Sequence, residues 1–175
     1  LVDWELEYAE KLCKFYHPEV IFHHDDFGSY RSSFMAPAMF KEFLVPAYKK
    51  IYGYYKEHGV QLIVHHSDSY AANLIEDMID MGIDIWQGAT STNNNAELIK
   101  KYGSKITIMG DFDNSVLDRG DITREEIAQI VRHSCESCGT KYFIPCLIRG
   151  LSGSTYPGVY EAVSEEIDKM SKEMF

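Results

Sequence analysis

The feature that most constrains the fold is a regular alternation of short apolar stretches with longer amphipathic ones. The apolar stretches have the length of buried strands and recur at intervals of roughly 20 to 40 residues, which is typical of parallel βαβ units. Strands of such units are covered on both faces and are therefore apolar along their length. The predicted strands are residues 19–23, 61–65, 83–87, 105–109 and 142–148.

The segments around these strands have the start and stop signals of helices. Gly59, Gly82 and Gly139 follow predicted helices, where glycine commonly ends a helix. Thr123 with Glu126 three residues later is a capping pattern that begins one. The predicted helices are residues 3–16, 37–57, 71–81, 95–102, 123–138 and 157–174.

Two architectures use βα units, the doubly wound open sheet and the (β/α)8 barrel. No G-x-G-x-x-G turn follows the first predicted strand, so the strongest sequence argument for a dinucleotide-binding sheet is missing. A closed barrel needs eight strands and about 200 residues or more, whereas this chain has 175 residues. The sequence predicts one α/β domain over residues 1–175, either a small open sheet or the later part of a barrel. Because Leu1 is not an initiator methionine, we expect a partial chain.

The charge balance excludes some classes of partner. A net charge of −10 is opposite to the clustered positive charge that nucleic acids and anionic membrane surfaces require. No apolar run approaches the roughly 20 residues that span a bilayer, and no secretory signal is visible. Four cysteines are too few for a disulfide scaffold in a chain of this length and fit a reducing compartment. We therefore expect a cytoplasmic protein that binds neither nucleic acid nor membrane.

Polar and ionisable side chains follow every predicted strand. Parallel strands bring their carboxyl ends to one rim, where both open α/β sheets and α/β barrels bind their ligands. One polar strand end is usually a capped turn, but five coincident ones indicate an active-site rim. The candidate site residues are His24, Asp25, Asp26, Tyr30, His66, Asp68, Gln87, Asp111, Asp113 and Arg149.

The end of the second predicted strand has the spacing of a metal site. One residue separates His66 from Asp68, so both side chains point the same way, while the alternation turns His65 toward the helices. We expect His66 and Asp68 to be metal ligands, with Asp25 or Asp26 close enough to complete or orient the site. The alternative is that His66 and Asp68 only hydrogen-bond each other and water.

Three further features carry weaker signals. Cys135 and Cys138 form a single C-x-x-C at a helix end, which is weak evidence for zinc without a second ligand pair. The Gly/Ser-rich segment RGLSGSTYPG after the last strand is of a kind that cradles phosphate in α/β barrels. His17 and His133 lie on helical stretches and are expected at the surface.

The order of these strand-end motifs resembles the uroporphyrinogen decarboxylase superfamily. The motifs are DD-x-G at Asp25, the histidine and ligand at His66, and G-x-x-D at Gly110, and the most specific stretch is HHDDFGSYRSSFMAPAMFKEFLVPAYKKIY. This superfamily contains uroporphyrinogen decarboxylase and cobalamin-linked, zinc-dependent methyltransferases. The resemblance covers nearly the whole chain and implies the C-terminal part of a (β/α)8 barrel, represented by about five βα units.

The methyltransferase branch implies a zinc site and a corrinoid protein as partner. In this branch, the strand that corresponds to residues 61–65 typically ends His-x-Cys-Gly. Here His66 keeps the histidine, while Asp68 takes the cysteine position. A further family cysteine falls at or near Leu151. With an oxygen ligand in place of sulfur, manganese or magnesium suits the site as well as zinc.

By this resemblance we expect methyl transfer between a small methylated substrate and a corrinoid protein. Asp25, Asp26, Asp111 and Arg149 are the expected catalytic residues. The expected substrate-binding residues are His24, Tyr30, Gln87 and Asp113. We also expect homo-oligomerisation, or association with the missing part of the barrel.

Two other functions stay open. Uroporphyrinogen decarboxylation needs no cofactor, but its polycarboxylate substrate calls for arginines, and only Arg149 and Arg31 are expected near the rim. The third possibility is a non-catalytic barrel that binds a small molecule.

Overall fold

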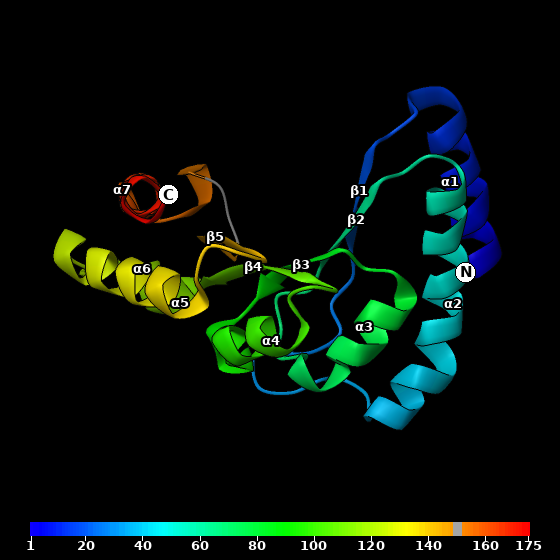
Figure 1. Cartoon of the computed structure of the whole chain (residues 1–175), viewed down its shortest axis with the longest axis horizontal. Coiled ribbons are helices and arrows are strands. Elements are labelled where there is room, and N and C mark those ends of the chain that lie inside the picture. The colour runs from blue at the N-terminus through cyan, green and yellow to red at the C-terminus, as the bar shows by residue number, and fades with distance from the viewer. Residues whose placement is uncertain (149–151) are drawn as a thin grey trace.

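The structure is a computed structural model that describes residues 1–148 and 152–175, with one parallel sheet and helices between its strands (Figure 1). The strands are β1 (Val20–His24), β2 (Leu62–His66), β3 (Ile85–Ala89), β4 (Thr107–Phe112) and β5 (Phe143–Leu147). The α-helices are α1 (Val2–Tyr16), α2 (Pro37–Glu57), α3 (Ile75–Met81), α4 (Asn95–Tyr102), α5 (Asn114–Leu117), α6 (Arg124–Cys138) and α7 (Val159–Met174). The 3₁₀ turns are η1 (Ala72–Leu74), η2 (Ser91–Asn93) and η3 (Ser152–Ser154).

The strand order decides between the two predicted architectures. All neighbours pair in parallel and the order is β1-β2-β3-β4-β5, the same as in the sequence. A doubly wound sheet reverses its strand order at a switch point, and this sheet has no reversal. The chain is therefore a singly wound wall of five βα units, as in part of a (β/α)8 barrel, and the α/β prediction is confirmed. The wall curves between β1 and β5 (Figure 1).

The hydrophobic core lies between the sheet and its outer helices. Ile63, Trp86 and Ile108 are fully buried from three successive strands and pack against α1 to α4. A second cluster joins Phe112 and Leu147 to α6 and α7. Because successive side chains of a strand point to opposite faces, burial on this side leaves the alternate residues on the concave side.

The concave face is apolar but only partly covered in this chain. Val20, Phe22, Leu62 and Ile144 point to it and are 47%, 57%, 40% and 39% exposed. In a closed barrel such residues fill the interior in layers. Among the described residues, β1 and β5 form the two edges of the sheet, so the wall is open on both sides.

Several predicted element ends are confirmed. Gly82 ends α3 with a φ of 89°, which only glycine adopts readily, and Thr123 and Glu126 form the predicted capping box of α6.

One helix differs from the prediction. The predicted helix 71–81 begins as the 3₁₀ turn η1, because the side chain of Asn93 accepts hydrogen bonds from the main-chain N–H groups of Ala71 and Ala72. The short helix α5 and the antiparallel bridge between Gly28 and Ser33 were not predicted.

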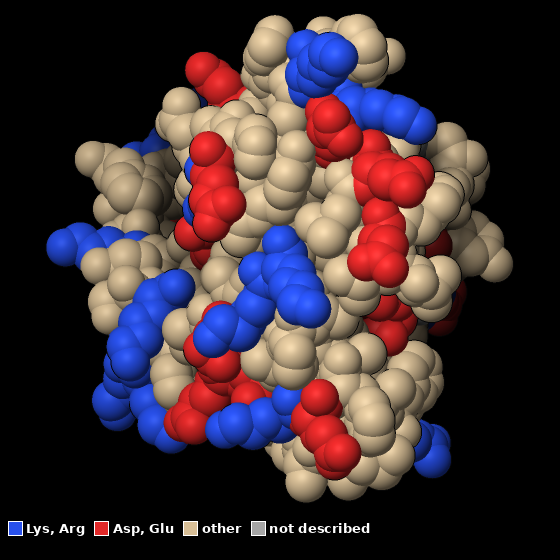
Figure 2. All heavy atoms as spheres, turned by 90° about the vertical axis from the view of Figure 1, so that its right-hand side faces the viewer, with Lys and Arg blue, Asp and Glu red and all other residues tan. Residues whose placement is uncertain are grey.

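The outer helical surface carries charges of both signs. Figure 2 shows Lys and Arg interspersed with Asp and Glu on the side where α1, α2 and α3 lie. Some of them pair across elements, as Lys49 does with Asp80 and Lys56 with Asp84. In the described part of the chain, no helix has both the length and the apolar character needed to cross a bilayer.

Candidate metal and substrate site

His66 is the centre of the candidate site at the end of β2. The sheet register places His24, His66 and Gln87 side by side on β1, β2 and β3. His66 is 7% exposed, and the ring of His24 stacks on its imidazole with 4.0 Å between centroids. The structure therefore brings together three of the predicted site residues.

The hydrogen bonds of Gln87 determine the tautomer of His66. The Gln87 amide nitrogen donates to the main-chain oxygen of Ile148 at 3.2 Å, so its Oε1 faces Nδ1 of His66. An amide oxygen can only accept, so Nδ1 of His66 donates to Gln87, and in the neutral ring the lone pair then lies on Nε2. The imidazole ring is thus oriented so that Nε2 can act as a metal ligand while Nδ1 is held by the side chain of Gln87.

Two carboxylates stand beside this lone pair. Oδ1 of Asp26 lies 3.9 Å from Nε2 of His66 and accepts a hydrogen bond of 3.0 Å from the main-chain N–H of Asp68. One ligand atom from each of Asp26, His66 and Asp68 lies within 4.8 Å of the other two. One nitrogen and two carboxylate oxygens suit zinc, and equally a harder divalent ion such as manganese. Of the two aspartates considered as the third ligand, the geometry favours Asp26.

Gly88 lets β3 approach this loop. Its φ is +95°, and a Cβ there would lie 2.9 Å from the main-chain oxygen of Ser67 and 3.0 Å from the nitrogen of Asp68. These contacts are with backbone, so no side-chain rearrangement would relieve them. Because Gly88 has no side chain, β3 can pack directly against the backbone of the Asp68 loop.

Asp25 and His65 face the helices instead. The Asp25 carboxylate accepts a hydrogen bond from the hydroxyl of Tyr48 on α2. His65 is fully buried, and burial lowers its pKa to about 3, so it remains neutral at physiological pH. The strand alternation that separates His65 from His66 is seen as predicted, and it removes the Asp25 carboxylate from the ligand group.

Asp113 connects three loops at the rim. Its buried carboxylate accepts hydrogen bonds from the hydroxyl of Tyr30 at 3.0 Å and from the main-chain N–H of Ser91 at 3.1 Å. Tyr30, Asp113 and Asp68 line a cavity of about 140 Å³. Two predicted substrate-binding residues thus lie together beside a predicted metal ligand.

Asp111 does not join this group. Its carboxylate accepts hydrogen bonds from Asn95 of α4 at 2.8 Å and from Ser134 of α6, both buried on the helical side of the sheet. The cause is a bulge: the pairing of β3 with β4 shifts at Gly88, and Asp111 has a φ of 76°. The predicted placement of Asp111 with the other rim residues is not what the structure shows.

Arg149 and Leu151 lie outside the described residues. The zinc reading of Cys135 and Cys138 gains no support, because the metal-capable group found among the described residues contains neither of them. All four cysteines are free thiols.

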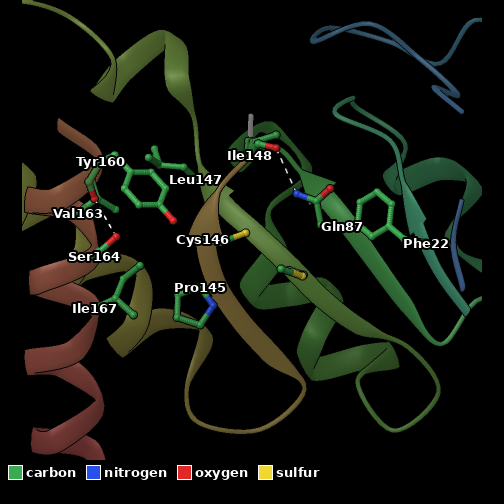
Figure 3. Close-up of a pocket in the computed structure, with 11 residues that line it drawn as sticks. Phe22, Gln87, Pro145, Cys146, Leu147, Ile148, Tyr160, Val163, Ser164 and Ile167 are labelled. Carbon is green, nitrogen blue, oxygen red and sulfur yellow. Dashed lines mark hydrogen bonds between the residues drawn. The ribbon is translucent and has the colours of Figure 1, made fainter. Parts of the chain in front are cut away.

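A hollow on the concave face contains a thiol that the sequence reasoning missed. Cys146 of β5 lines a hollow of about 430 Å³ that is bordered by Phe22 and α7. Figure 3 shows its side chain pointing toward Gln87. Burial raises the pKa of Cys146 to about 11, and a hydrogen bond with Gln87 opposes this. Alternation along the last predicted strand could have placed this thiol on the concave face.

Among the solved structures, the fold is similar to a methyltransferase from Methanosarcina mazei, with a TM-score of 0.73 and 16% sequence identity. The match covers 97% of this chain and 47% of that one, so this chain spans less than half of the methyltransferase's length. No curated protein has significant sequence similarity to it.

The family model described as "Uroporphyrinogen decarboxylase (URO-D)" matches residues 6–170. These residues include every strand and all the described site residues, and the match confirms the resemblance inferred from the strand-end motifs. The chain belongs to the uroporphyrinogen decarboxylase (URO-D) family.

Proposed function

We propose that this chain forms part of a URO-D-family methyltransferase that moves a methyl group between a small substrate and a corrinoid protein. The observation that carries the proposal is the grouping of Asp26, His66 and Asp68, with Nε2 of His66 free to act as a ligand because Gln87 holds Nδ1. The fold likeness to a methyltransferase supports the same branch of the family.

Asp26, His66 and Asp68 would hold a divalent ion, zinc by family resemblance. When bound, such an ion supplies Lewis acidity, which lowers the pKa of a coordinated thiol or water. Two neighbouring residues would orient the ligand His66. Gln87 accepts the hydrogen bond from Nδ1 of His66, and the ring of His24 covers one face of its imidazole. Asp113 and Tyr30 shape the adjoining cavity, whose volume of about 140 Å³ suits a small substrate.

The second candidate is porphyrinogen decarboxylation, which the description of the family model favours. Its substrate carries several carboxylates, which call for cationic partners. The described residues lining the 140 Å³ cavity include Asp68 and Asp113 but no Lys or Arg, and this charge pattern supports methyl transfer over decarboxylation.

The test is a pair of assays on the full-length, metal-replete protein. Methylcobalamin demethylation with a simple thiol acceptor should proceed and should be lost in His66→Ala, while uroporphyrinogen should not be consumed. Asp111→Asn is the control, because that carboxylate faces the helices. Uroporphyrinogen turnover would make the protein a decarboxylase, and inactivity in both assays with retained ligand binding would favour a non-catalytic barrel. The corrinoid partner, the cytoplasmic location and a homo-oligomer or completed barrel are part of the same proposal.

A further inference from the structure

Two tyrosines of α2 reach the ends of β1 and β2 from the helical side. Tyr48 and Tyr52 lie one helical turn apart and are 7% and 0% exposed. The Tyr52 hydroxyl lies 2.6 Å from Nδ1 of His65, and Nε2 of His65 lies 2.9 Å from the main-chain oxygen of Asp25. A buried chain of hydrogen bonds therefore runs from α2 through His65 to the strand end.

The directions of these bonds follow from their partners. A carbonyl oxygen only accepts, so Nε2 of His65 carries the proton, Nδ1 accepts, and the Tyr52 hydroxyl donates. The imidazole is also held between two rings, with Phe27 stacked at 4.3 Å and His23 at 5.7 Å between centroids. His65 thus has one ring orientation and one tautomer that satisfy every contact.

The bonded oxygen belongs to the peptide group that joins Asp25 to Asp26. The other side of Asp25 is fixed by its N–H, which donates to the main-chain oxygen of His66 at 3.2 Å. Beyond this peptide, the Asp26 carboxylate bonds the N–H of Asp68 and stands 3.9 Å from Nε2 of His66. The orientation of the peptide therefore determines where the Asp26 carboxylate lies relative to His66.

We propose that Tyr52 and His65 are positioning residues that hold the Asp26 carboxylate for a divalent ion bound with His66 and Asp68. The inference rests on the proposed metal site and extends it to a helix that has no ligand of its own. Without the Tyr52 hydroxyl, His65 can adopt the tautomer with its proton on Nδ1. The lone pair of Nε2 would then face the main-chain oxygen of Asp25, and the hydrogen bond that orients the Asp25–Asp26 peptide group would be lost.

The test uses Co²⁺ titration of the full-length protein, followed by its visible absorption, with Zn²⁺ as competitor. Tyr52→Phe should weaken Co²⁺ binding about tenfold, as loss of an outer hydrogen bond to a metal site typically does, and should change the absorption bands of the bound ion. His65→Gln keeps an N–H for the Asp25 carbonyl and should bind more tightly than His65→Leu. Tyr55→Phe is the matched control, a third buried tyrosine of α2, and should bind as the wild type does.

The outcomes separate the two proposals. If the wild type does not bind Co²⁺, the metal site fails and the positioning role falls with it. If the wild type binds Co²⁺, and Tyr52→Phe and the His65 variants show the same Co²⁺ affinity and absorption spectrum as the wild type, the metal site stands and the positioning role is wrong. Should His65→Leu fail to fold, the pair Tyr52→Phe and Tyr55→Phe still decides, because each removes only a hydroxyl.

Discussion

At the scale of single residues, the proposed role of His66 as a metal ligand depends on Gln87. We predict that Gln87→Ala weakens divalent-metal binding by about 10- to 100-fold, the usual cost of losing an outer hydrogen bond to a metal-bound histidine. Gln87→Glu should bind the ion more tightly than Gln87→Ala, because its carboxylate still accepts the Nδ1 proton, although it lacks the N–H that Gln87 donates to the main-chain oxygen of Ile148. Isothermal titration with Zn²⁺ measures both, and equal affinity of Gln87→Ala and wild type would exclude this role.

Asp111 and Asp68 form a matched pair of rim aspartates. Asp68→Asn should weaken Zn²⁺ binding at least about tenfold, because it removes a charged oxygen ligand. Asp111→Asn should leave Zn²⁺ affinity within about twofold, because residues that share no partner act nearly independently and the Asp111 carboxylate bonds Asn95 and Ser134 rather than a candidate ligand. A larger loss in Asp111→Asn than in Asp68→Asn would reverse the assignment.

The sequence predicted the His66 group because period-two alternation holds through the end of β2. It could not predict the direction of Asp111, because the bulge at Gly88 and the positive φ of Asp111 depend on how β3 and β4 pair. Nor could it choose between Asp25 and Asp26, since that choice depends on the long-range contact of Asp25 with Tyr48.

At the scale of elements, helix ends with local chemistry were the most predictable. The box at the start of α6 places the main-chain N–H of Glu126 on the hydroxyl of Thr123, while the Glu126 carboxylate accepts from the Thr123 N–H at 2.8 Å. Strand ends were less predictable, and β4 continues to Phe112 rather than ending at 109, because strand length is decided by pairing with neighbours.

Thr123→Ala should therefore destabilise the fold by about 1 kcal/mol at pH 7, the usual value of a lost Thr cap. Hydrogen bonds from Thr123, first of all from its main-chain N–H, lower the pKa of Glu126 below its ordinary 4.5. Thr123→Ala keeps the main-chain bond and removes the hydroxyl, which donates to the Glu126 carboxylate at 2.9 Å. The part of the cap that depends on this hydroxyl bond is present above pH 4.5 and is lost as the pH falls through the lowered native pKa of Glu126.

Urea unfolding of wild type and Thr123→Ala at pH 7 and at pH 3 measures the effect, with the exposed Ser137→Ala near the other end of α6 as control. The difference between wild type and Thr123→Ala should shrink at pH 3. A difference that stays constant or grows on acidification would contradict the capping account.

At the scale of the whole molecule, the sequential strand order and the URO-D family match describe one wall of a barrel. Its concave side presents apolar residues that a closed barrel would bury, and exposed apolar patches together with free sheet edges promote association. We predict that the 175-residue chain self-associates through this side.

Phe22→Asp should reduce that self-association in sedimentation velocity. Phe43→Asp is the control, because Phe43 is similarly exposed, at 60% against 57%, but lies on α2 on the outer side. Equal effects of the two substitutions would show that association does not use the concave face.

The central claim is that the ends of β1 and β2 form one divalent-metal site, and zinc titration of the purified full-length protein tests it most directly. The account predicts one Zn²⁺ per chain in the wild type and loss of that binding in His66→Ala and in Asp68→Ala, both variants remaining folded. Absence of stoichiometric zinc or manganese binding in the wild type, or unchanged binding in both variants, would contradict it.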